Sequence, residues 1–524
     1  MMTIVERQNY TELVKTNQTL QDENLLLKAQ VEWYRQQFKL AKAREFGPSS
    51  EKMTPTQEVL VFNEAEQVAE PEPLEATIEV PAHKRKAKKT HEELFKNIPV
   101  EEKLFQLEGD DLLCKTCNKT MHVVGTQVHQ ELEIIPPQFK LIRSVREKAC
   151  CSECQKEGRE VPFVVAPMPK PAFPGSIASP SAVAFILVQK FVLGIPLYRQ
   201  EQYLKNQGLP LSRQTLANWM LWGAEILIRI YNRMKMHLLA LDILHADETE
   251  MQVLKEPGRK AQTKSYMWLY LSGRAGPPIV IYEYKPTRAA EHPKKFLQNF
   301  TGYLHADGYQ CYENLPGVTV AGCWSHARRK FFDIVKILPK EARDKGKTSA
   351  HAGLAFCDKI FEIERELHAC SDEERKASRL KLSKPVLDEF RLWLDVQSVS
   401  ALPQSALGKA VGYSLNQWSK LIVFLEDGRL EVDNNRAERA VKPFVIGRKN
   451  WLFANTPCGA QSSAISYSVV ETAKQNGLNP LAYLTHVFST LHHVASQDTD
   501  ALDALMPWSE EMQTRFNIDK QSPA

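Results

Sequence analysis

Leu244-His245-Ala246-Asp247 recurs as Leu304-His305-Ala306-Asp307, and apolar residues precede the tetrapeptide in both places. Each copy predicts a short strand that leaves a hydrophobic core and ends on a carboxylate. Two carboxylates at strand ends can bind divalent cations when a third ligand joins them, and residues 432–439 contain a candidate in Glu438. The alternative is a chance repeat whose aspartates only form turns.

Strand patterns surround both copies of the repeat. We predict strands over residues 239–247, 265–271, 279–284, 302–307 and 318–323, with helices over 289–300 and from Ser325 onward. Three antiparallel strands followed by alternating helix and strand is the plan of an RNase H-like domain. In that plan the first and fourth strands are neighbours, which would place Asp247 beside Asp307.

The RNase H-like core is predicted to span residues 238–480 and to contain an all-helical insertion over about 336–426. Ser371 and Glu374 form a capping-box pattern within the insertion. After it, Asp433 can cap a helix that carries Glu438 back toward the sheet, and Pro443 bends or ends that helix. Residues 481–524 are predicted to form a C-terminal helical segment.

Three carboxylates arranged in this way suit cleavage of phosphodiester bonds by two metal ions roughly 3.5–4 Å apart. We assign the bridging position to Asp247, because it lies on the central strand, and the flanking positions to Asp307 and Glu438. Oxygen ligands together with substrate phosphates favour Mg²⁺ or Mn²⁺.

Cations crowd the predicted carboxylate site and indicate a polyanionic substrate such as DNA. Solvated charged helices are the alternative for each cluster taken singly. His326 could protonate a leaving oxygen, contact a phosphate or be structural. The candidate DNA-binding residues of the two clusters are His326, Arg328, Arg329, Arg436, Arg439, Lys442, Arg448 and Lys449.

Residues 166–237 predict a helical DNA-binding domain. Helical patterns run over 181–191 and 197–206, and a third helix begins after Ser212, a favourable N-cap residue. This outline is typical of a helix-turn-helix, in which Arg213 and Gln214 would face the DNA groove at the start of the third helix. Any three-helix domain looks similar, which is the alternative.

Two CxxC pairs separated by 33 residues predict a structural zinc site within residues 96–165. A site with four thiolate ligands leaves no open coordination position and should not be catalytic. The predicted ligands are Cys114, Cys117, Cys151 and Cys154.

Residues 1–50 carry a heptad stripe of apolar residues and predict a coiled coil, with Asn17 and Asn24 at successive a positions. A helix that packs on its own protein is the alternative. Residues 51–95 predict a charged linker, in which residues 83–89 hold five Lys or Arg side chains. These cations could contact phosphates or simply be solvated.

The 524 residues are 43% hydrophobic and 25% charged, with a formal net charge of +4, a composition typical of soluble globular proteins. So small a net charge does not by itself imply a nucleic-acid partner. Evidence for such a partner must come from local clusters of basic residues. The sequence shows no signal-peptide pattern and no apolar run near the ~20 residues of a membrane span. We therefore expect a cytoplasmic protein without a membrane partner.

The chain resembles the transposases of the insertion sequence sixty-six family, often called TnpC-type, over nearly its whole length. The DNNRAER segment is the most specific part. One departure is Pro48-Ser49, where relatives often have basic residues. The matching stretches are Phe46-Gly47 with Ser50-Glu51-Lys52, the CxxC pairs, Leu197-Tyr198-Arg199-Gln200, the two HAD segments, and residues 323–331, 433–453, 454–457, 471–474 and 476–478.

The resemblance implies a DDE transposase that cuts and joins DNA at the terminal repeats of its own element. It assigns the metal-binding triad to Asp247, Asp307 and Glu438, and the zinc ligands to the four cysteines. It also implies target DNA as a partner, at least a dimer, accessory proteins from the same element, and a bacterial cytoplasm near the nucleoid.

Two other functions fit the same motifs. A DNA-binding protein with a zinc module, a helix-turn-helix and an inactive RNase H-like core would keep every segment except a working triad. An RNase H-like nuclease or junction resolvase would need neither the coiled coil nor the zinc module.

Overall fold

The computed structural model describes residues 137–519, apart from 151–155, 157–162 and 496. The predicted coiled coil, the charged linker and all four predicted zinc ligands lie outside the described residues. The described residues belong to two compact units, one up to Ile177 and one from Ala178 onward. In the smaller unit, β1 (Lys148–Cys150) pairs antiparallel with β2 (Phe163–Val165).

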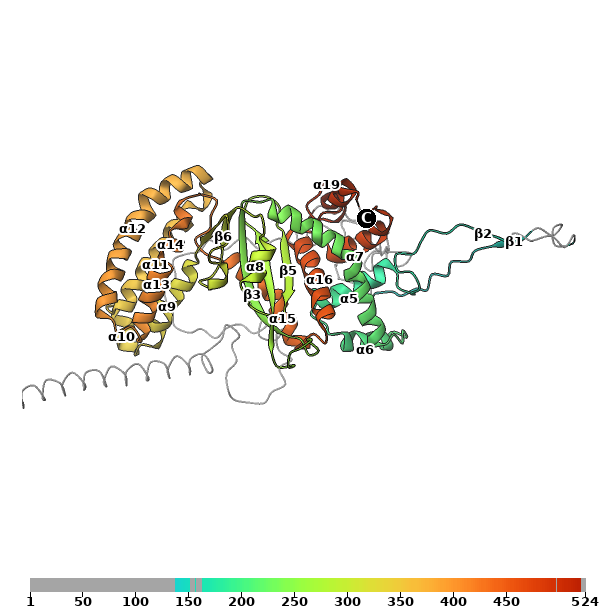
Figure 1. Cartoon of the computed structure of the whole chain (residues 1–524), viewed down its shortest axis with the longest axis horizontal. Coiled ribbons are helices and arrows are strands. Elements are labelled where there is room, and N and C mark those ends of the chain that lie inside the picture. The colour runs from blue at the N-terminus through green and yellow to red at the C-terminus, as the bar shows by residue number, and fades with distance from the viewer. Residues whose placement is uncertain (1–136, 151–155, 157–162, 496, 520–524) are drawn as a thin grey trace, which may run out of the picture. The chain divides into compact units, whose positions relative to one another are not determined.

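The larger unit is built on a five-stranded sheet with the strand order β5-β4-β3-β6-β7 (Figure 1). The first three strands along the chain are antiparallel, and β6 and β7 run parallel to β3. The first and fourth of the predicted strands are therefore neighbours, as expected. The strands are β3 (Ile243–Gln252), β4 (Lys264–Ser272), β5 (Val280–Lys285), β6 (Gly302–His305) and β7 (Val318–Ala321).

The first repeat does not end its strand, and this part of the prediction was wrong. The helix α7 (Arg213–Leu239) continues through Leu239, so β3 begins only at Ile243. Beyond Asp247, β3 continues to Gln252 because these residues pair with β4. The parallel pairing with β6 stops earlier, at His245 opposite His305.

Helices cover both faces of the sheet. Alternation along the strands turns Trp268 and Tyr270 to one face, where the Tyr270 ring stacks on Phe296 of α8 (Glu291–Phe296), with centroids 3.7 Å apart. Tyr282 faces the opposite side, and its ring lies 5.5 Å from that of Tyr467. The helices on that side are α15 (Asn435–Trp451), which packs along β3, and α16 (Pro457–Gln475), which packs on β5.

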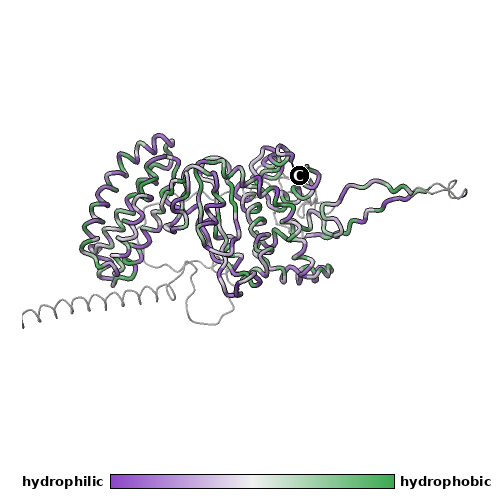
Figure 2. The backbone as a smooth tube through the Cα atoms, viewed as in Figure 1, coloured by the Kyte–Doolittle hydropathy of each residue, from purple (hydrophilic) through white to green (hydrophobic). Residues whose placement is uncertain are grey.

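The predicted insertion is mainly helical, and its Phe390 packs with Trp324 and Phe331 of the preceding helix in one buried core. Ser371 and Glu374 form the predicted capping box. In Figure 2 these helices alternate between hydrophobic and hydrophilic residues, as expected for helices with one buried side. The helix before the insertion is α9 (Trp324–Ile337), and the helices of the insertion are α10 (Lys340–Lys345), α11 (Ser349–Glu366), α12 (Asp372–Ser400), α13 (Ala406–Asn416) and α14 (Trp418–Leu421).

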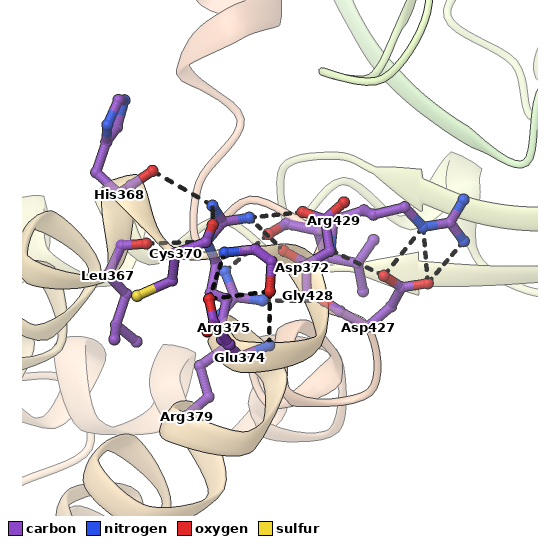
Figure 3. Close-up of polar contacts among 12 residues, drawn as sticks. Leu367, His368, Cys370, Asp372, Glu374, Arg375, Arg379, Asp427, Gly428 and Arg429 are labelled. Atoms are coloured by element: carbon purple, nitrogen blue, oxygen red, sulfur yellow. Dashed lines mark hydrogen bonds and ion pairs between the residues drawn. The ribbon is translucent and has the colours of Figure 1, made fainter.

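Two buried arginines of α12 join the insertion to the segment that leads into α15. Arg379 forms an ion pair with Glu364 and donates to the carbonyls of Phe424, Asp427 and Leu430. Arg375 donates to the carbonyls of Leu367, His368, Cys370 and Gly428, as Figure 3 shows. Because a buried guanidinium needs several acceptors, these contacts hold residues 424–430 in one place.

The three helices before the sheet lie close to the predicted ranges, and Ser212 caps the third by accepting from the Thr215 N–H. They are α5 (Pro180–Phe191), α6 (Leu197–Asn206) and α7. The chain ends in α17 (Pro480–Thr490), α18 (Thr499–Ala504) and α19 (Glu510–Phe516). Among the described residues, no helix combines the length and hydrophobicity that a bilayer span requires.

Candidate active site

Asp247 and Asp307 each lie two residues beyond the last parallel pair of β3 and β6. Since neighbouring strands are about 4.8 Å apart, this register places the two carboxylates side by side. Asp247 Oδ1 accepts the N–H of Glu248 at 2.8 Å, and Asp307 Oδ1 accepts the N–H of Tyr309 at 2.9 Å. These backbone contacts orient both side chains.

The pKa of Asp247 is raised to about 7, chiefly because the carboxyl group is buried. The negative charge of Glu248 adds to the shift, and those of Asp307 and Glu438 contribute further. A carboxylate under such repulsion favours any cation that can neutralise it.

Glu438 lies in the first turn of α15. Its Oε1 atom is 3.8 Å from His326 Nε2, and its Oε2 atom is 3.5 Å from the Arg329 guanidinium. Oε1 is buried and has no hydrogen-bond partner among the described groups. Asp433 was expected to cap this helix, but Asn434 is the N-cap residue, and Asp433 instead accepts from the side chains of Ser325 and Asn435 and from the Asn435 N–H.

Asn434 connects the three segments that carry the site, a role that the sequence did not reveal. Its Nδ2 donates to the carbonyl of Ala246 at 2.8 Å, directly before Asp247, and its Oδ1 lies 2.9 Å from His245 Nδ1. Its backbone N–H donates to Cys323 Sγ at 3.2 Å, at the start of α9. A polar N-cap residue before a helix carrying a glutamate was the available signal.

The two histidines of the repeat form a buried layer next to the carboxylates. Their rings stack, and Glu431 lies against both: its Oε2 is 3.3 Å from His245 Nε2, and its N–H donates to His305 Nε2 at 3.2 Å. Burial lowers the pKa of His245 to about 4, and it lowers the pKa of His305 as well. Both rings are therefore neutral near pH 7, as a buried layer requires.

Glu248 anchors the loop that carries Asp307. Its side chain is 1% exposed, forms an ion pair with Arg288 and accepts the Tyr312 hydroxyl at 2.6 Å. Arg288 in turn lies 3.6 Å from the ring of Tyr309, whose hydroxyl donates to the Arg288 carbonyl. The two aspartates are thus joined through one polar network, which sequence spacing alone could not show.

The structure brings only some of the predicted DNA-binding residues to the carboxylates. His326 and Arg329 contact Glu438, and the Arg329 side chain is 53% exposed. Arg328 pairs instead with Asp358, and Arg436 pairs with Glu431. Arg448 lies 3.4 Å from the Thr249 hydroxyl, whereas Arg439, Lys442 and Lys449 are exposed on α15.

Arg213 and Gln214 are exposed at the start of α7. The Arg213 N–H donates to the side chain of Glu201 in α6, and Gln214 donates to Asn218 one turn further along α7. Within the described part of the chain, no ion pair or hydrogen bond joins either residue to the carboxylate site. The hydrogen bonds of both residues thus lie within the three-helix module.

Comparison with protein families gives four matches. Residues 175–462 match the model "Transposase IS66 family", and residues 468–508 match the IS66 C-terminal element. Residues 111–155 match the zinc-finger binding domain of transposase IS66, and residues 33–102 match "Transposase C of IS166 homeodomain". The first match alone includes the five strands, the insertion and all three carboxylates.

Similar proteins occur in Sinorhizobium fredii (strain NBRC 101917 / NGR234). Uncharacterized protein y4hP is 33% identical over 414 residues, covering 75% of this chain and 73% of its own length. Uncharacterized protein y4jD is 31% identical over 420 residues, covering 77% of this chain and 79% of its own length. No solved structure matches the chain. The match over residues 175–462 and the similarity to these relatives show that the chain belongs to the IS66 family of transposases.

Proposed function

We propose that this chain is a DDE transposase that cuts and joins DNA at the ends of its own insertion sequence. The observation that carries the proposal is the convergence of Asp247, Asp307 and Glu438, which come from β3, from the loop after β6 and from α15. The sheet supports an RNase H-like core, because three antiparallel strands are followed by two parallel strands beside β3.

The residues at this site fit divalent cations. Glu438 Oε1 is buried without a hydrogen-bond partner among the described residues, and burial together with the neighbouring negative charges raises the pKa of Asp247. Asp247, Asp307 and Glu438 would together hold two Mg²⁺ or Mn²⁺ ions. When bound, such ions activate the attacking oxygen and stabilise the leaving oxygen of a phosphodiester.

The other groups of the site bind and orient the DNA. Arg329 reaches Glu438 with an exposed guanidinium and can hold a phosphate beside the carboxylates. His326 Nε2 lies against Glu438, where it can donate a proton or a hydrogen bond to a leaving oxygen. Arg439, Lys442 and Lys449 extend the cationic surface along α15 and would contact the DNA backbone at successive phosphates.

Outside the described residues, we propose that Cys114, Cys117, Cys151 and Cys154 hold a structural zinc ion within the segment that matches the family's zinc-finger domain. A self-associating N-terminal coiled coil would pair two chains, as joining two DNA ends requires. The element's end sequences and target DNA are the proposed partners, together with accessory proteins encoded by the same element.

Cleavage of a labelled duplex carrying the element's own end tests this function. Wild type should cleave in the presence of Mg²⁺ and leave a free 3′-hydroxyl, whereas Asp247→Asn and Glu438→Gln should bind the duplex without cleaving it. Asp388→Asn, which alters an exposed carboxylate in α12, is the matched control and should cleave normally. Binding without cleavage by wild type, even with the neighbouring gene products added, would instead support an inactive core.

A further inference from the structure

Cys323, His326 and Glu438 form a second group of potential metal ligands, beside the two aspartates. Cys323 is the N-cap residue of α9, His326 lies in its first turn, and Glu438 arrives from α15. One ligand atom of each residue lies within 4.8 Å of the other two. We propose that this triplet binds a thiophilic transition-metal ion such as Zn²⁺, and that the bound ion withdraws Glu438 from the catalytic magnesium site. The second half of this inference rests on the proposed function.

The sulfur of Cys323 is oriented for a metal ion. The residue is 1% exposed, and its Sγ accepts the backbone N–H of Asn434 at 3.2 Å. It also lies at the N-terminus of a 14-residue helix, where the helix dipole favours negative charge. Burial nevertheless raises the pKa of the thiol to about 12, so the thiolate needs a bound cation to displace its proton.

The other two ligands have unused lone pairs. Glu438 Oε1 is a buried atom without a hydrogen-bond partner in the described part of the chain, and the neutral imidazole of His326 can offer its Nε2 lone pair to a metal ion. His326 Nε2 and Glu438 Oε1 are 3.8 Å apart. Two ligands of a tetrahedral zinc ion are about 3.4 Å apart, given Zn–N and Zn–O bonds of roughly 2.1 Å. A small side-chain adjustment would bring both onto one ion.

The donor set selects the metal. One sulfur, one nitrogen and one oxygen ligand favour Zn²⁺ or Co²⁺ over Mg²⁺, which prefers oxygen alone. Two of the ligands come from a Cys-x-x-His pair, a short spacing typical of zinc sites, and three protein ligands leave a fourth position for water. Because Glu438 belongs to both groups, a Zn²⁺ ion in this site should draw the Glu438 carboxylate toward Cys323 and His326 and thereby weaken its binding of Mg²⁺.

Cobalt titration of the full-length chain, loaded beforehand with one equivalent of Zn²⁺ for the four-cysteine site, tests the triplet without DNA. Wild type should bind one additional Co²⁺ per chain and develop a sulfur-to-cobalt charge-transfer band. Cys323→Ser should lose that band, and Cys323→Ser and His326→Gln should each weaken Co²⁺ affinity at least tenfold. Cys458→Ser, which alters an exposed free cysteine, should behave as wild type. Equal Co²⁺ binding and an equal band in wild type, Cys323→Ser and His326→Gln would overturn the proposal.

Thermal unfolding shows whether the variants are folded, and Cys323→Ala provides a second test if the serine variant is not. Buffered Zn²⁺ should inhibit Mg²⁺-dependent cleavage by wild type, and at least tenfold more Zn²⁺ should be needed for Cys323→Ser. If the same Zn²⁺ concentration inhibits Cys323→Ser and wild type, Zn²⁺ bound at Cys323 does not withdraw Glu438 from Mg²⁺. Should wild type show no cleavage at all, the proposed function fails, while the cobalt titration still decides whether the site exists.

Discussion

The imidazole rings of His245 and His305 stack with their centroids 4.4 Å apart and their planes inclined by 15°. These are equivalent residues of the two tetrapeptide copies, which pair in register on parallel strands. Each aspartate follows its histidine by two residues, so the same register places Asp247 beside Asp307. A repeat separated by some sixty residues in sequence thus becomes one site in space.

The buried histidine pair should make the protein sensitive to acid. Because the folded-state pKa of His245 is about 4 and the unfolded value is near 6.5, the unfolded chain binds more protons between these pH values. Stability contributed by His245 is therefore complete above pH 6.5 and falls by about 3 kcal/mol as the pH drops to 4.

Asp247 opposes this loss of stability on acidification. Because its pKa is raised in the folded state, the folded protein binds a proton at Asp247 between pH 7 and 4 that the unfolded chain does not bind. The substitution Asp247→Asn removes that opposing contribution, and denaturant unfolding at pH 7.5 and pH 5 measures its effect on the free energy of unfolding. The loss of stability on acidification should be larger in this variant than in wild type. An equal loss in both proteins would contradict the assigned pKa shift of Asp247.

Magnesium affinity should depend on pH through Asp247. Its pKa of about 7 means that a proton must leave before the carboxylate can bind a cation. Below pH 7 the Mg²⁺ concentration for half-maximal cleavage should rise about tenfold per pH unit, and above pH 8 it should level off. A half-maximal concentration that is constant between pH 6 and 8 would exclude Asp247 as the titrating ligand.

Glu248 should act by positioning Asp307 rather than by binding metal. Glu248→Ala removes the acceptor of both Arg288 and Tyr312, so the loop carrying Asp307 loses its anchor. We expect cleavage to fall on the order of 10²-fold, the effect of a displacement near 1 Å, and excess Mg²⁺ should restore part of the rate.

Glu248→Gln keeps the shape and one acceptor and should also recover part of the rate. The rate of cleavage is measured against Mg²⁺ concentration for each variant. Duplex binding is measured alongside and should be unchanged in both, which separates a positioning role from a general loss of structure. If Glu248→Ala cleaves like wild type at every Mg²⁺ concentration, the network does not position Asp307.

DNA affinity should reveal which cations contact phosphates. Arg439 and Lys442 are exposed, and among the described residues neither forms an ion pair. Replacing either by alanine should weaken duplex binding and reduce the slope of log K against log salt by about one. Arg328 already pairs with Asp358, so Arg328→Ala should change the slope less. Slopes that are equal in all three variants and wild type would refute this assignment.

Local patterns in the sequence determined much of this protein. The period of the apolar residues predicted five strands and a helical stretch between residues 336 and 426, and both are present near the predicted positions. Capping chemistry at Ser212 and at Ser371 was also readable, because it depends only on residues three apart. The repeated tetrapeptide, with Glu438 downstream, was enough to select the three carboxylates as candidates.

Only the tertiary structure decided how those carboxylates are held. Asn434 contacts Ala246 and Cys323, which are 188 and 111 residues away in the chain, and Glu248 reaches Tyr312 across 64 residues. No local pattern records such contacts, because they arise from the packing of distant segments. The length of β3 beyond Asp247 was missed for the same reason: pairing with β4 extends a strand through polar residues that alternation alone would end.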